Sequence, residues 1–314
     1  MLKKIVLSDA DAHKSVIFVG FDGGGSNSRI ILKSSESDTI RRDFLRSIKY
    51  IDVGVESSAQ TLYQMITELY PLDQWDKAYL TISLSGAGDV QKNNEFTQQL
   101  SRMFSPNEVD CHIESDSSFT LQAAYPNGES GYLLISGTGS VAIARSIDSS
   151  ISKVGGWGRL LGDEGSGYWI GLQALKLYTK ATDGAMAKGK LFHSLKAQFD
   201  EISNGDFTLL RSILYSNSLY PAKFASLVFE CAEDPSALSI IQEGGQHLAK
   251  NIALLATRSE HQIGNMVTLH GSVACNPLTI KYITEALPKE FIITTISSDQ
   301  VLNYALHCSK ARTT

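Results

Sequence analysis

Residues 155–171 read GGWGRLLGDEGSGYWIG, and this stretch is the most informative part of the chain. Seven of its seventeen residues are glycine, a density typical of backbone that turns sharply or approaches a ligand closely. A flexible linker would contain Gly and Ser with little else, whereas two Trp, two acids and an apolar run are interleaved here. We therefore interpret the stretch as an ordered loop that leads into a helix and binds something small and polar.

Two strand–turn–strand units precede this loop, and they resemble each other. The first spans residues 16–32 around the turn DGGGS (22–26), and the second spans residues 132–144 around the turn SGTGS (136–140). Short apolar runs flank the glycine-rich turn in both units. An internal duplication is stronger evidence for a fold than any single motif, and this one predicts two related domains.

Strand and helix signals alternate along the rest of the chain, which predicts an α/β fold. Further strands are expected at residues 79–84, 109–114, 266–269 and 291–296. Helical spacing of apolar residues predicts helices near residues 62–69, 96–104, 117–125 and 301–306 and over most of 167–260. Residues 1–14 are polar and unpatterned, and we expect them to form a disordered leader.

Composition excludes several classes of protein. The 314 residues carry a formal net charge of −5, which argues against a nucleic-acid-binding protein with its basic surface. No apolar run approaches the ~18 residues that a bilayer requires, so no membrane partner is expected. The four cysteines are widely separated and form no C-x-x-C pair, which is typical of reduced thiols in a cytoplasmic protein. A homodimer is among the assemblies that the sequence allows.

The first glycine-rich turn has the residues of a phosphate site. Gly24 and Gly25 allow the backbone to aim N–H groups at one anion, and Ser26 and Asn27 add side-chain donors. Asp22 would not bind phosphate directly, but it could hold Mg²⁺ through water beside the phosphate oxygens. The alternative is an ordinary hairpin turn, because Asp-Gly is a common hairpin signal. The second similar turn favours the phosphate interpretation, since two turns can hold a polyphosphate from both sides.

Asp116 is the best candidate for a general base. It follows the strand at 109–114 and precedes both a short helix and the second glycine-rich turn. A kinase that acts on a hydroxyl group needs a carboxylate beside the acceptor oxygen. The alternative is that Asp116 caps the helix, a role that the neighbouring serines could also fill.

The opening stretch itself could bind a sugar. Trp157 offers a flat apolar face for a sugar ring, and Asp163 and Glu164 offer acceptors for hydroxyl groups. The alternative makes Trp157 part of the core and Asp163 a helix cap. Because glycine flanks Trp157 on both sides, we predict that it lies at a surface. After the late strand, Gly271 could bring backbone against a nucleobase.

These motifs resemble the N-acetylglucosamine kinase family, which belongs to the superfamily of acetate and sugar kinases, heat-shock chaperones and actin. The family also includes glucosamine kinases and the ATPase activators of 2-hydroxyacyl-CoA dehydratases. The resemblance covers about residues 15–310 and implies an α/β protein with two actin-like (ribonuclease H-like) domains flanking a ligand cleft. The first domain would comprise residues 15–122 plus 298–314, and the second residues 123–297.

The resemblance also implies roles for individual residues. Asp116 matches the catalytic base, and Asp22 matches a carboxylate near Mg²⁺. Phosphate contacts are implied for Gly24, Gly25, Ser26, Gly137 and Thr138, amino-sugar contacts for Gly139, Gly156, Trp157 and Asp163, and adenosine contacts for Gly271 and Ser272. The family often carries an Asn before Val53 that contacts the sugar, and residues 48–52 (IKYID) contain none.

The sequence therefore predicts a kinase that uses ATP and Mg²⁺ to phosphorylate the 6-hydroxyl of an amino sugar, N-acetylglucosamine first and glucosamine second. Two other classes stay open. An activator ATPase would need cysteine ligands for an iron–sulfur cluster, and no cysteine lies in a glycine-rich loop that suggests one. A non-enzymatic sensor would be expected to lack Asp22 or Asp116, and both are present.

Overall fold

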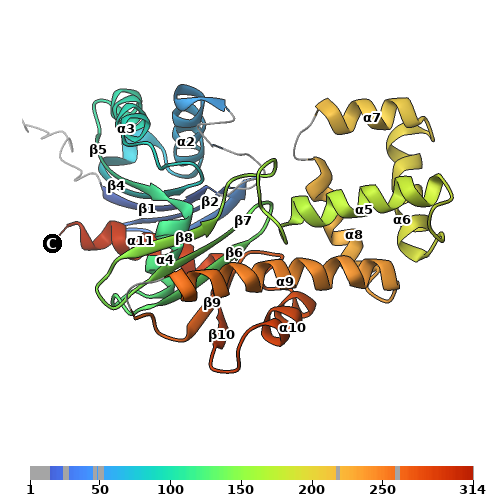
Figure 1. The fold of residues 1–314 in the computed structure, drawn as a ribbon. Coiled ribbons are helices and arrows are strands. Elements are labelled where there is room, and N and C mark those ends of the chain that lie inside the picture. The colour runs from blue at the N-terminus through green and yellow to red at the C-terminus, as the bar shows by residue number, and fades with distance from the viewer. Residues whose placement is uncertain are drawn as a thin grey trace, which may run out of the picture. The chain divides into compact units, whose positions relative to one another are not determined.

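The computed structural model describes residues 15–23, 28–44, 48, 53–216, 220–258 and 262–313. The chain divides into two compact units (Figure 1). Unit 1 comprises Met1–Phe119 and Val301–Thr314, and unit 2 comprises Thr120–Gln300. The leader expected at residues 1–14 lies outside the described residues.

Unit 1 is built on a mixed five-stranded sheet in the order β3-β2-β1-β4-β5. Its strands are β1 (Ser15–Gly23), β2 (Ser28–Ser34), β3 (Ile40–Phe44), β4 (Trp75–Leu84) and β5 (Glu108–Ser115). β1, β2 and β3 are antiparallel neighbours, while β4 and β5 run parallel to β1. The carboxyl ends of β1, β4 and β5 therefore lie at one edge of the sheet.

Helices cover both faces of this sheet. α2 (Val55–Leu69) and α3 (Val90–Phe104) pack on the face that carries Ile17, Val19 and Phe21 (Figure 1). The 3-10 turn η1 (Leu72–Gln74) then leads into β4. α11 (Ser298–Ala311) packs on the opposite face, where a side chain on Gly20 would lie 2.7 Å from the backbone nitrogen of Leu306. α4 (Asp116–Ala124) contains the point at which unit 1 passes into unit 2.

Unit 2 repeats the sheet of unit 1. Its strands are β6 (Gly131–Ser136), β7 (Ser140–Arg145), β8 (Ile151–Gly155), β9 (Met266–His270) and β10 (Ile292–Thr295), in the order β8-β7-β6-β9-β10. The first three are antiparallel neighbours and the last two run parallel to β6, the same pattern as in unit 1. α9 (Pro235–Arg258) and α10 (Pro277–Ala286) cover the face that carries Leu134 and Ala142.

The connection from β8 to β9 in unit 2 also carries a group of helices, which we call the helical insertion. It contains α5 (Gly167–Thr182), α6 (Lys190–Ser203), α7 (Phe207–Ser216), the 3-10 helix η2 (Tyr220–Phe224) and α8 (Ala225–Glu230). These helices share a hydrophobic cluster with the first part of α9, with Leu195, Phe199 and Phe224 at its centre. The insertion therefore has its own core beside the core of the sheet.

The α/β fold and the duplication expected from the sequence are confirmed by the two matching sheets. The apolar runs predict eight of the ten strands in these sheets and miss β3 and β8. All four cysteines are free thiols, as expected.

Candidate active site

The start of α5 holds the turn Ser136–Ser140 of unit 2 in place through backbone hydrogen bonds. The backbone N–H groups of Gly167 and Tyr168 donate to the carbonyl oxygens of Gly137 (2.7 Å) and Thr138 (3.2 Å). In a trans peptide the N–H points opposite to the C=O, so the N–H groups of Thr138 and Gly139 point away from α5. Two successive N–H groups that point the same way form a concave site for an anion such as phosphate.

The first four backbone N–H groups of α5 already have hydrogen-bond acceptors within the protein. Its first two N–H groups bond to the turn, and Ser166 caps the helix by accepting the N–H of Trp169 at its side chain (3.2 Å) and that of Ile170 at its carbonyl (2.8 Å). Ser166 is therefore the helix cap, and the alternative role of Asp163 as that cap does not apply. Any anion contact in this part of unit 2 falls to the turn.

The loop 155–165 also packs against this turn. Ser136 Oγ donates to the carbonyl oxygen of Gly165 (2.9 Å), and Ser140 Oγ donates to that of Glu164 (3.0 Å). The N–H of Gly156 in turn donates to the carbonyl oxygen of Ser140 (3.0 Å). The two serines that frame the turn therefore hold both ends of the loop in place.

Asp163 lies at the contact between the loop and the turn. Its backbone is left-handed (φ 62°), a strained conformation for a residue other than glycine, and its side chain is only 9% exposed. One carboxylate oxygen lies 2.9 Å from the position that a side-chain carbon on Gly139 would occupy. Glycine at position 139 is therefore required for the carboxylate to approach the turn so closely.

The tip of the loop presents apolar side chains to solvent. Trp157 is 75% exposed, and Leu160 and Leu161 are exposed as well. The N–H groups of Leu161 and Gly162 both donate to the carbonyl oxygen of Gly158, which closes the tip into a tight turn. The prediction that Trp157 lies at a surface is therefore confirmed, and its contact with a ligand stays a prediction.

The segment after β9 wraps the other side of the turn. The N–H groups of Val273 and Ala274 both donate to the carbonyl oxygen of Ser136 (3.0 Å each). Gly271 has a positive φ of 98°, and a side-chain carbon there would lie 2.5 Å from the same oxygen. His270 donates from Nδ1 to the carbonyl oxygen of Ile296 (2.9 Å), because a carbonyl can only accept. Unit 2 thus brings Asp163 and Gly271 to the turn that contains Gly137 and Gly139, although the three segments are distant in sequence.

The sheet edge of unit 1 carries carboxylates instead. Asp22 on β1 pairs in register with Ser83 on β4, and Ser83 pairs with Glu114 on β5. The buried Ser83 donates from Oγ to Asp22 Oδ1 (3.3 Å). Asp116 follows at the same edge, one residue after β5 ends. Three carboxylates thus lie along one edge of the sheet.

Asp116 is not needed as a helix cap, because Ser115 Oγ accepts the N–H of Ser118 (3.2 Å) in that role. Asp116 itself accepts the N–H of Ser117 at Oδ1 (2.7 Å). This bond fixes the rotation of the carboxylate at the start of α4. The other oxygen, Oδ2, has no bond assigned to it among the described residues.

Among the described residues, no group of three or more acidic, His or Cys side chains could hold a metal ion, so Mg²⁺ bound at Asp22 would need phosphate oxygens and water as its other ligands. Mg²⁺ prefers oxygen ligands and keeps several waters, so one or two carboxylates plus phosphate oxygens suffice to hold it. Asp22 and Glu114 would repel phosphate without such a cation. Gly24, Gly25, Ser26 and Asn27, the expected phosphate contacts of unit 1, lie outside the described residues.

The sequence did not predict the contributions of Ser83, Ser136, Ser140 and Ser166. Ser136, Ser140 and Ser166 lie inside motifs already singled out, but the bonds of Ser136 and Ser140 join segments that are distant in the chain. A buried serine at the end of a strand was the one available signal for Ser83.

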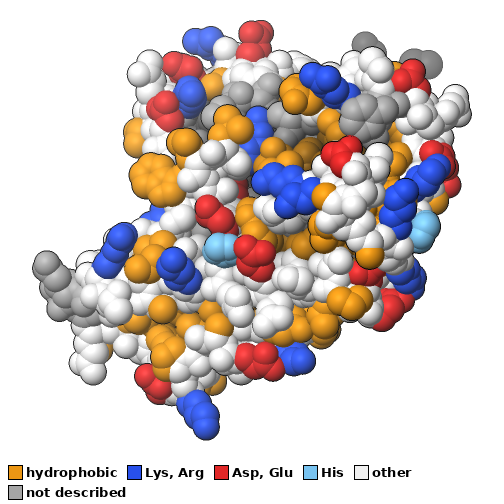
Figure 2. Space-filling model, turned by 45° about the vertical axis from the view of Figure 1, so that its right-hand side comes forward, with side chains coloured by type: hydrophobic (Ala, Val, Ile, Leu, Met, Phe, Trp, Pro, Cys, Tyr) orange, Lys and Arg blue, Asp and Glu red, His pale blue; other side chains and the backbone are white. Residues whose placement is uncertain are grey.

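The surface of the described residues mixes the two signs of charge. Figure 2 shows Lys and Arg side chains interspersed with Asp and Glu over one face. The absence of a nucleic-acid partner stays a prediction from the net charge of −5. Among the described helices, none is both long and apolar enough to cross a membrane.

Comparison with known proteins identifies relatives of the chain. The family model of the BadF/BadG/BcrA/BcrD ATPase family matches residues 19–301. An N-acetylmuramic acid/N-acetylglucosamine kinase of Clostridium acetobutylicum is 27% identical over 168 residues, which are 52% of this chain and 54% of that protein. An N-acetyl-D-glucosamine kinase of Dictyostelium discoideum is 25% identical over 185 residues, 56% of this chain and 58% of that protein. These matches span little more than half the length of the two kinases.

A longer match joins the chain to a glucosamine kinase of Vibrio cholerae, at 25% identity over 82% of this chain and 85% of that protein. Among solved structures, a proposed N-acetylglucosamine kinase of Chromobacterium violaceum has a TM-score of 0.69 at 24% identity, covering 94% of this chain and 99% of that one. A hexokinase of Schistosoma mansoni complexed with glucose has a TM-score of 0.55 at 13% identity, covering 94% and 85%. These structures confirm the expected actin-like fold of sugar kinases.

Proposed function

Because this chain belongs to the BadF/BadG/BcrA/BcrD ATPase family, we propose that it is a kinase that uses ATP to phosphorylate the 6-hydroxyl of an amino sugar. N-acetylglucosamine is the first candidate acceptor and glucosamine the second, in line with the activities of the three curated relatives. The observation that carries the proposal is the place of Asp116. Asp116 follows the carboxyl end of β5, and Ser115 caps the helix that begins there. The carboxylate of Asp116 is therefore available for a proton transfer.

On this proposal Asp116 is the catalytic base. Its Oδ1 is held by the N–H of Ser117, and Oδ2 accepts the proton of the acceptor hydroxyl. The hydroxyl oxygen then bonds to the γ-phosphorus of ATP as the bond to the β-phosphate bridging oxygen breaks, and ADP leaves. A positioned base of this kind contributes about 10²–10⁴ to the rate of such reactions.

The nucleotide is assigned to glycine-rich backbone. In unit 2, Gly137 and Thr138 are assigned to the phosphates, and the N–H of Thr138, which points away from α5, would donate to them. Gly271 and Ser272 are assigned to adenosine, while the first turn supplies Gly24, Gly25, Ser26 and Asn27. Asp22 would hold Mg²⁺ through water, and that ion supplies charge neutralisation between the phosphates and the carboxylates of unit 1.

The acceptor sugar is assigned to the loop of unit 2. Trp157 offers an exposed aromatic face to a sugar ring, and Asp163 offers a carboxylate to its hydroxyl groups. A side-chain carbon at Gly139 would meet the carboxylate of Asp163, and one at Gly156 would meet the side chains of Lys153 and Val141. Glycine at both positions therefore lets the backbone pack closely against these side chains. A sugar bound there would cover part of the apolar tip of the loop, where Trp157 is 75% exposed.

A screen for ADP release tests the proposal. The chain would be incubated with ATP and Mg²⁺ and with N-acetylglucosamine, glucosamine, N-acetylmannosamine, glucose or no sugar. The expected result is strong ADP release with one amino sugar and release at least about tenfold slower without sugar, because the acceptor completes the reacting geometry. Rapid release that no sugar stimulates would instead support an ATPase, and mass spectrometry of the product would locate the phosphate at the 6-position.

A further inference from the structure

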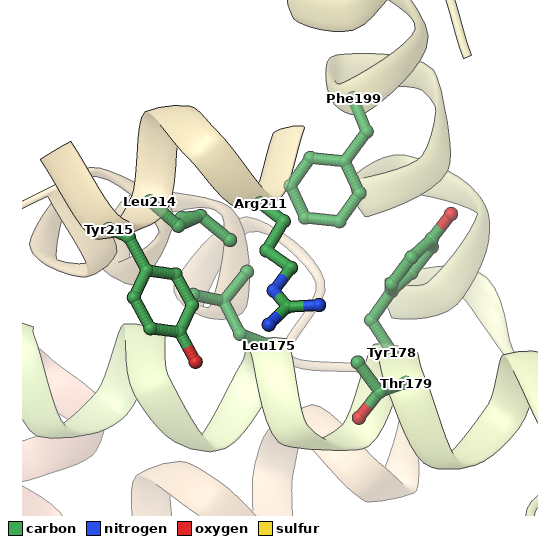
Figure 3. A pocket seen from close by; sticks show the side chains of 7 residues that line it. All are labelled: Leu175, Tyr178, Thr179, Phe199, Arg211, Leu214 and Tyr215. Atoms are coloured by element: carbon green, nitrogen blue, oxygen red, sulfur yellow. The ribbon is translucent and has the colours of Figure 1, made fainter. Parts of the chain in front are cut away.

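A pocket that is open to solvent lies between α5, α6 and α7 of the helical insertion, and none of its residues is assigned above to nucleotide or sugar (Figure 3). Its volume is about 320 Å³. Leu175, Tyr178 and Thr179 of α5 and Phe199 of α6 form one wall. Arg211, Leu214 and Tyr215 of α7 form the other wall.

The wall formed by α5 and α6 is fixed by aromatic packing. The ring of Tyr178 stacks on that of Phe192 with centroids 5.0 Å apart, and it meets Phe199 edge-on at 4.6 Å. Phe199 is buried and packs in turn against Phe224 at 5.3 Å. Because these rings hold one another, the wall is formed before any ligand binds.

The opposite wall carries the one cation of the pocket lining. Arg211, Leu214 and Tyr215 are spaced i, i+3 and i+4, so they share one face of α7. Figure 3 shows the guanidinium of Arg211 between the rings of Tyr178 and Tyr215, pointing toward α5. It lies 5.6 Å from the centroid of the Tyr215 ring. Among the described residues, no carboxylate forms an ion pair with Arg211.

We propose that this pocket binds an amphipathic organic anion. An aromatic or branched apolar body would fit between Leu175, Tyr178 and Leu214, and its carboxylate would pair with Arg211. The proposal goes beyond the kinase activity and does not depend on it, since the ligand would bind through residues of the insertion alone.

Titration with 8-anilinonaphthalene-1-sulfonate tests the proposal, because this fluorescent probe joins aromatic rings to an anionic group. ADP and Mg²⁺ would be present in excess to occupy any nucleotide site. The expected result is saturable binding of one probe per chain, displaced by 3-phenylpropanoate, which carries an aromatic ring and a carboxylate as the proposed ligand does. Arg211→Gln should weaken binding by about tenfold, as expected for a lost charge-assisted hydrogen bond.

Two further variants make the test specific to the pocket. Thr179→Trp places a ring in the mouth of the pocket and should abolish probe binding. Lys180→Gln removes a charge from the next position of α5, outside the lining, and should leave binding unchanged. Both of these side chains and Arg211 are exposed, so all the variants should keep the melting temperature of the parent chain. Binding that does not saturate, that survives Arg211→Gln or Thr179→Trp, or that weakens equally in Lys180→Gln would overturn the proposal.

Discussion

The two units share one sheet topology but differ in what they carry at the carboxyl edge of the parallel strands. In unit 1, Asp22, Glu114 and Asp116 place three carboxylates along that edge. In unit 2, the corresponding strand ends lead into backbone turns around Gly137 and Gly271. On the proposed function, the carboxylates of unit 1 serve a cation and a proton transfer, and the turn at 136–140 of unit 2 serves an anion.

The units also differ in the segment that connects the third strand of each sheet to the fourth strand in chain order. In unit 1 this connection contains α2 and η1, whereas in unit 2 it contains the loop 155–165, the helical insertion and α9. The insertion has its own core and its own pocket. Duplication therefore supplied two similar sheets, and the features that distinguish them lie in edge residues and in inserted segments.

The largest expected effect comes from the carboxylate edge of unit 1. Asp116→Asn should lower kcat by about 10³, because the amide cannot accept the proton of the acceptor hydroxyl. The N–H of Ser117 can still bond to the amide oxygen, so the start of α4 should be retained. Steady-state ADP release gives kcat, and calorimetry should show that the sugar and ATP still bind.

A matched variant separates this effect from a change in net charge. Glu95→Gln removes one exposed carboxylate of the same unit, on α3, and should leave kcat within about twofold of the parent chain, as expected for surface changes. Near-normal turnover in Asp116→Asn would remove Asp116 from the role of base.

The helical insertion should be the part of unit 2 least tolerant of added volume. A side-chain carbon at Gly171 of α5 would lie 1.8 Å from the carbonyl oxygen of Pro221 in η2. Gly171→Ala should therefore lower the free energy of unfolding by at least about 3 kcal/mol, measured by urea denaturation. Gly88→Ala in unit 1 is the control, because no atom lies within 4 Å of the added carbon. Equal stability of the two variants would contradict this account of the α5–η2 contact.

The sequence predicted the strands that are apolar and missed the two that are not. β3 contains Arg41, Arg42 and Asp43, and β8 has a mixed polar sequence. Both lie at the edge of their sheet, where charged side chains prevent pairing with other chains and where no apolar run is needed. Composition alone therefore cannot identify such strands.

The sequence predicted the glycine-rich turns of the candidate site, but it did not predict which of these turns contact one another. Glycine density indicated where backbone turns, and the exposure of Trp157 agrees with its glycine neighbours. The bonds from Gly167 and Tyr168 to the turn at 137–138 join segments about thirty residues apart, and no local pattern encodes them. Local signals fix turns and caps, whereas tertiary packing decides which turns meet.

Asp234 should be a key residue for the stability of the helical insertion, because it joins the start of α6 to the start of α9. Its Oδ2 accepts the N–H of Leu191 at the start of α6 (2.9 Å), and its Oδ1 accepts that of Ser236 at the start of α9 (2.8 Å). In Asp234→Asn the NH₂ group of the amide would face one of these two N–H donors, and that donor would lose its acceptor. The variant should therefore be less stable than the parent chain by about 2 kcal/mol at pH 7. Asp206→Asn is the control, because Asp206 caps α7 with one oxygen only.

The effect of Asp234→Asn should depend on pH. Burial alone would raise the pKa of Asp234, but the hydrogen bonds from Leu191 and Ser236 outweigh burial and hold the pKa below its ordinary value. A lowered pKa stabilises the fold above the unfolded value of about 3.9, and this contribution is lost as the pH falls through the folded value. The difference in stability between the two chains should thus be constant from pH 7 to about pH 5 and narrow below about pH 4, by urea denaturation. A difference that does not change with pH would argue against the charged cap.

The smallest expected effect comes from a variant of a glycine in unit 2. It tests whether this glycine is needed for the fold or for ligand binding. Gly137 has no atom within 4 Å of an added side-chain carbon, whereas such a carbon at Gly271 would lie 2.5 Å from a carbonyl oxygen. Gly137→Ala should therefore keep the melting temperature of the parent chain and raise KM for ATP by about tenfold, which corresponds to about 1.4 kcal/mol. KM for the sugar should stay unchanged, because Gly137 is assigned to the phosphates alone. A lower melting temperature would show that the space beside Gly137 is filled, and an unchanged KM for ATP would place the phosphates elsewhere than on this turn.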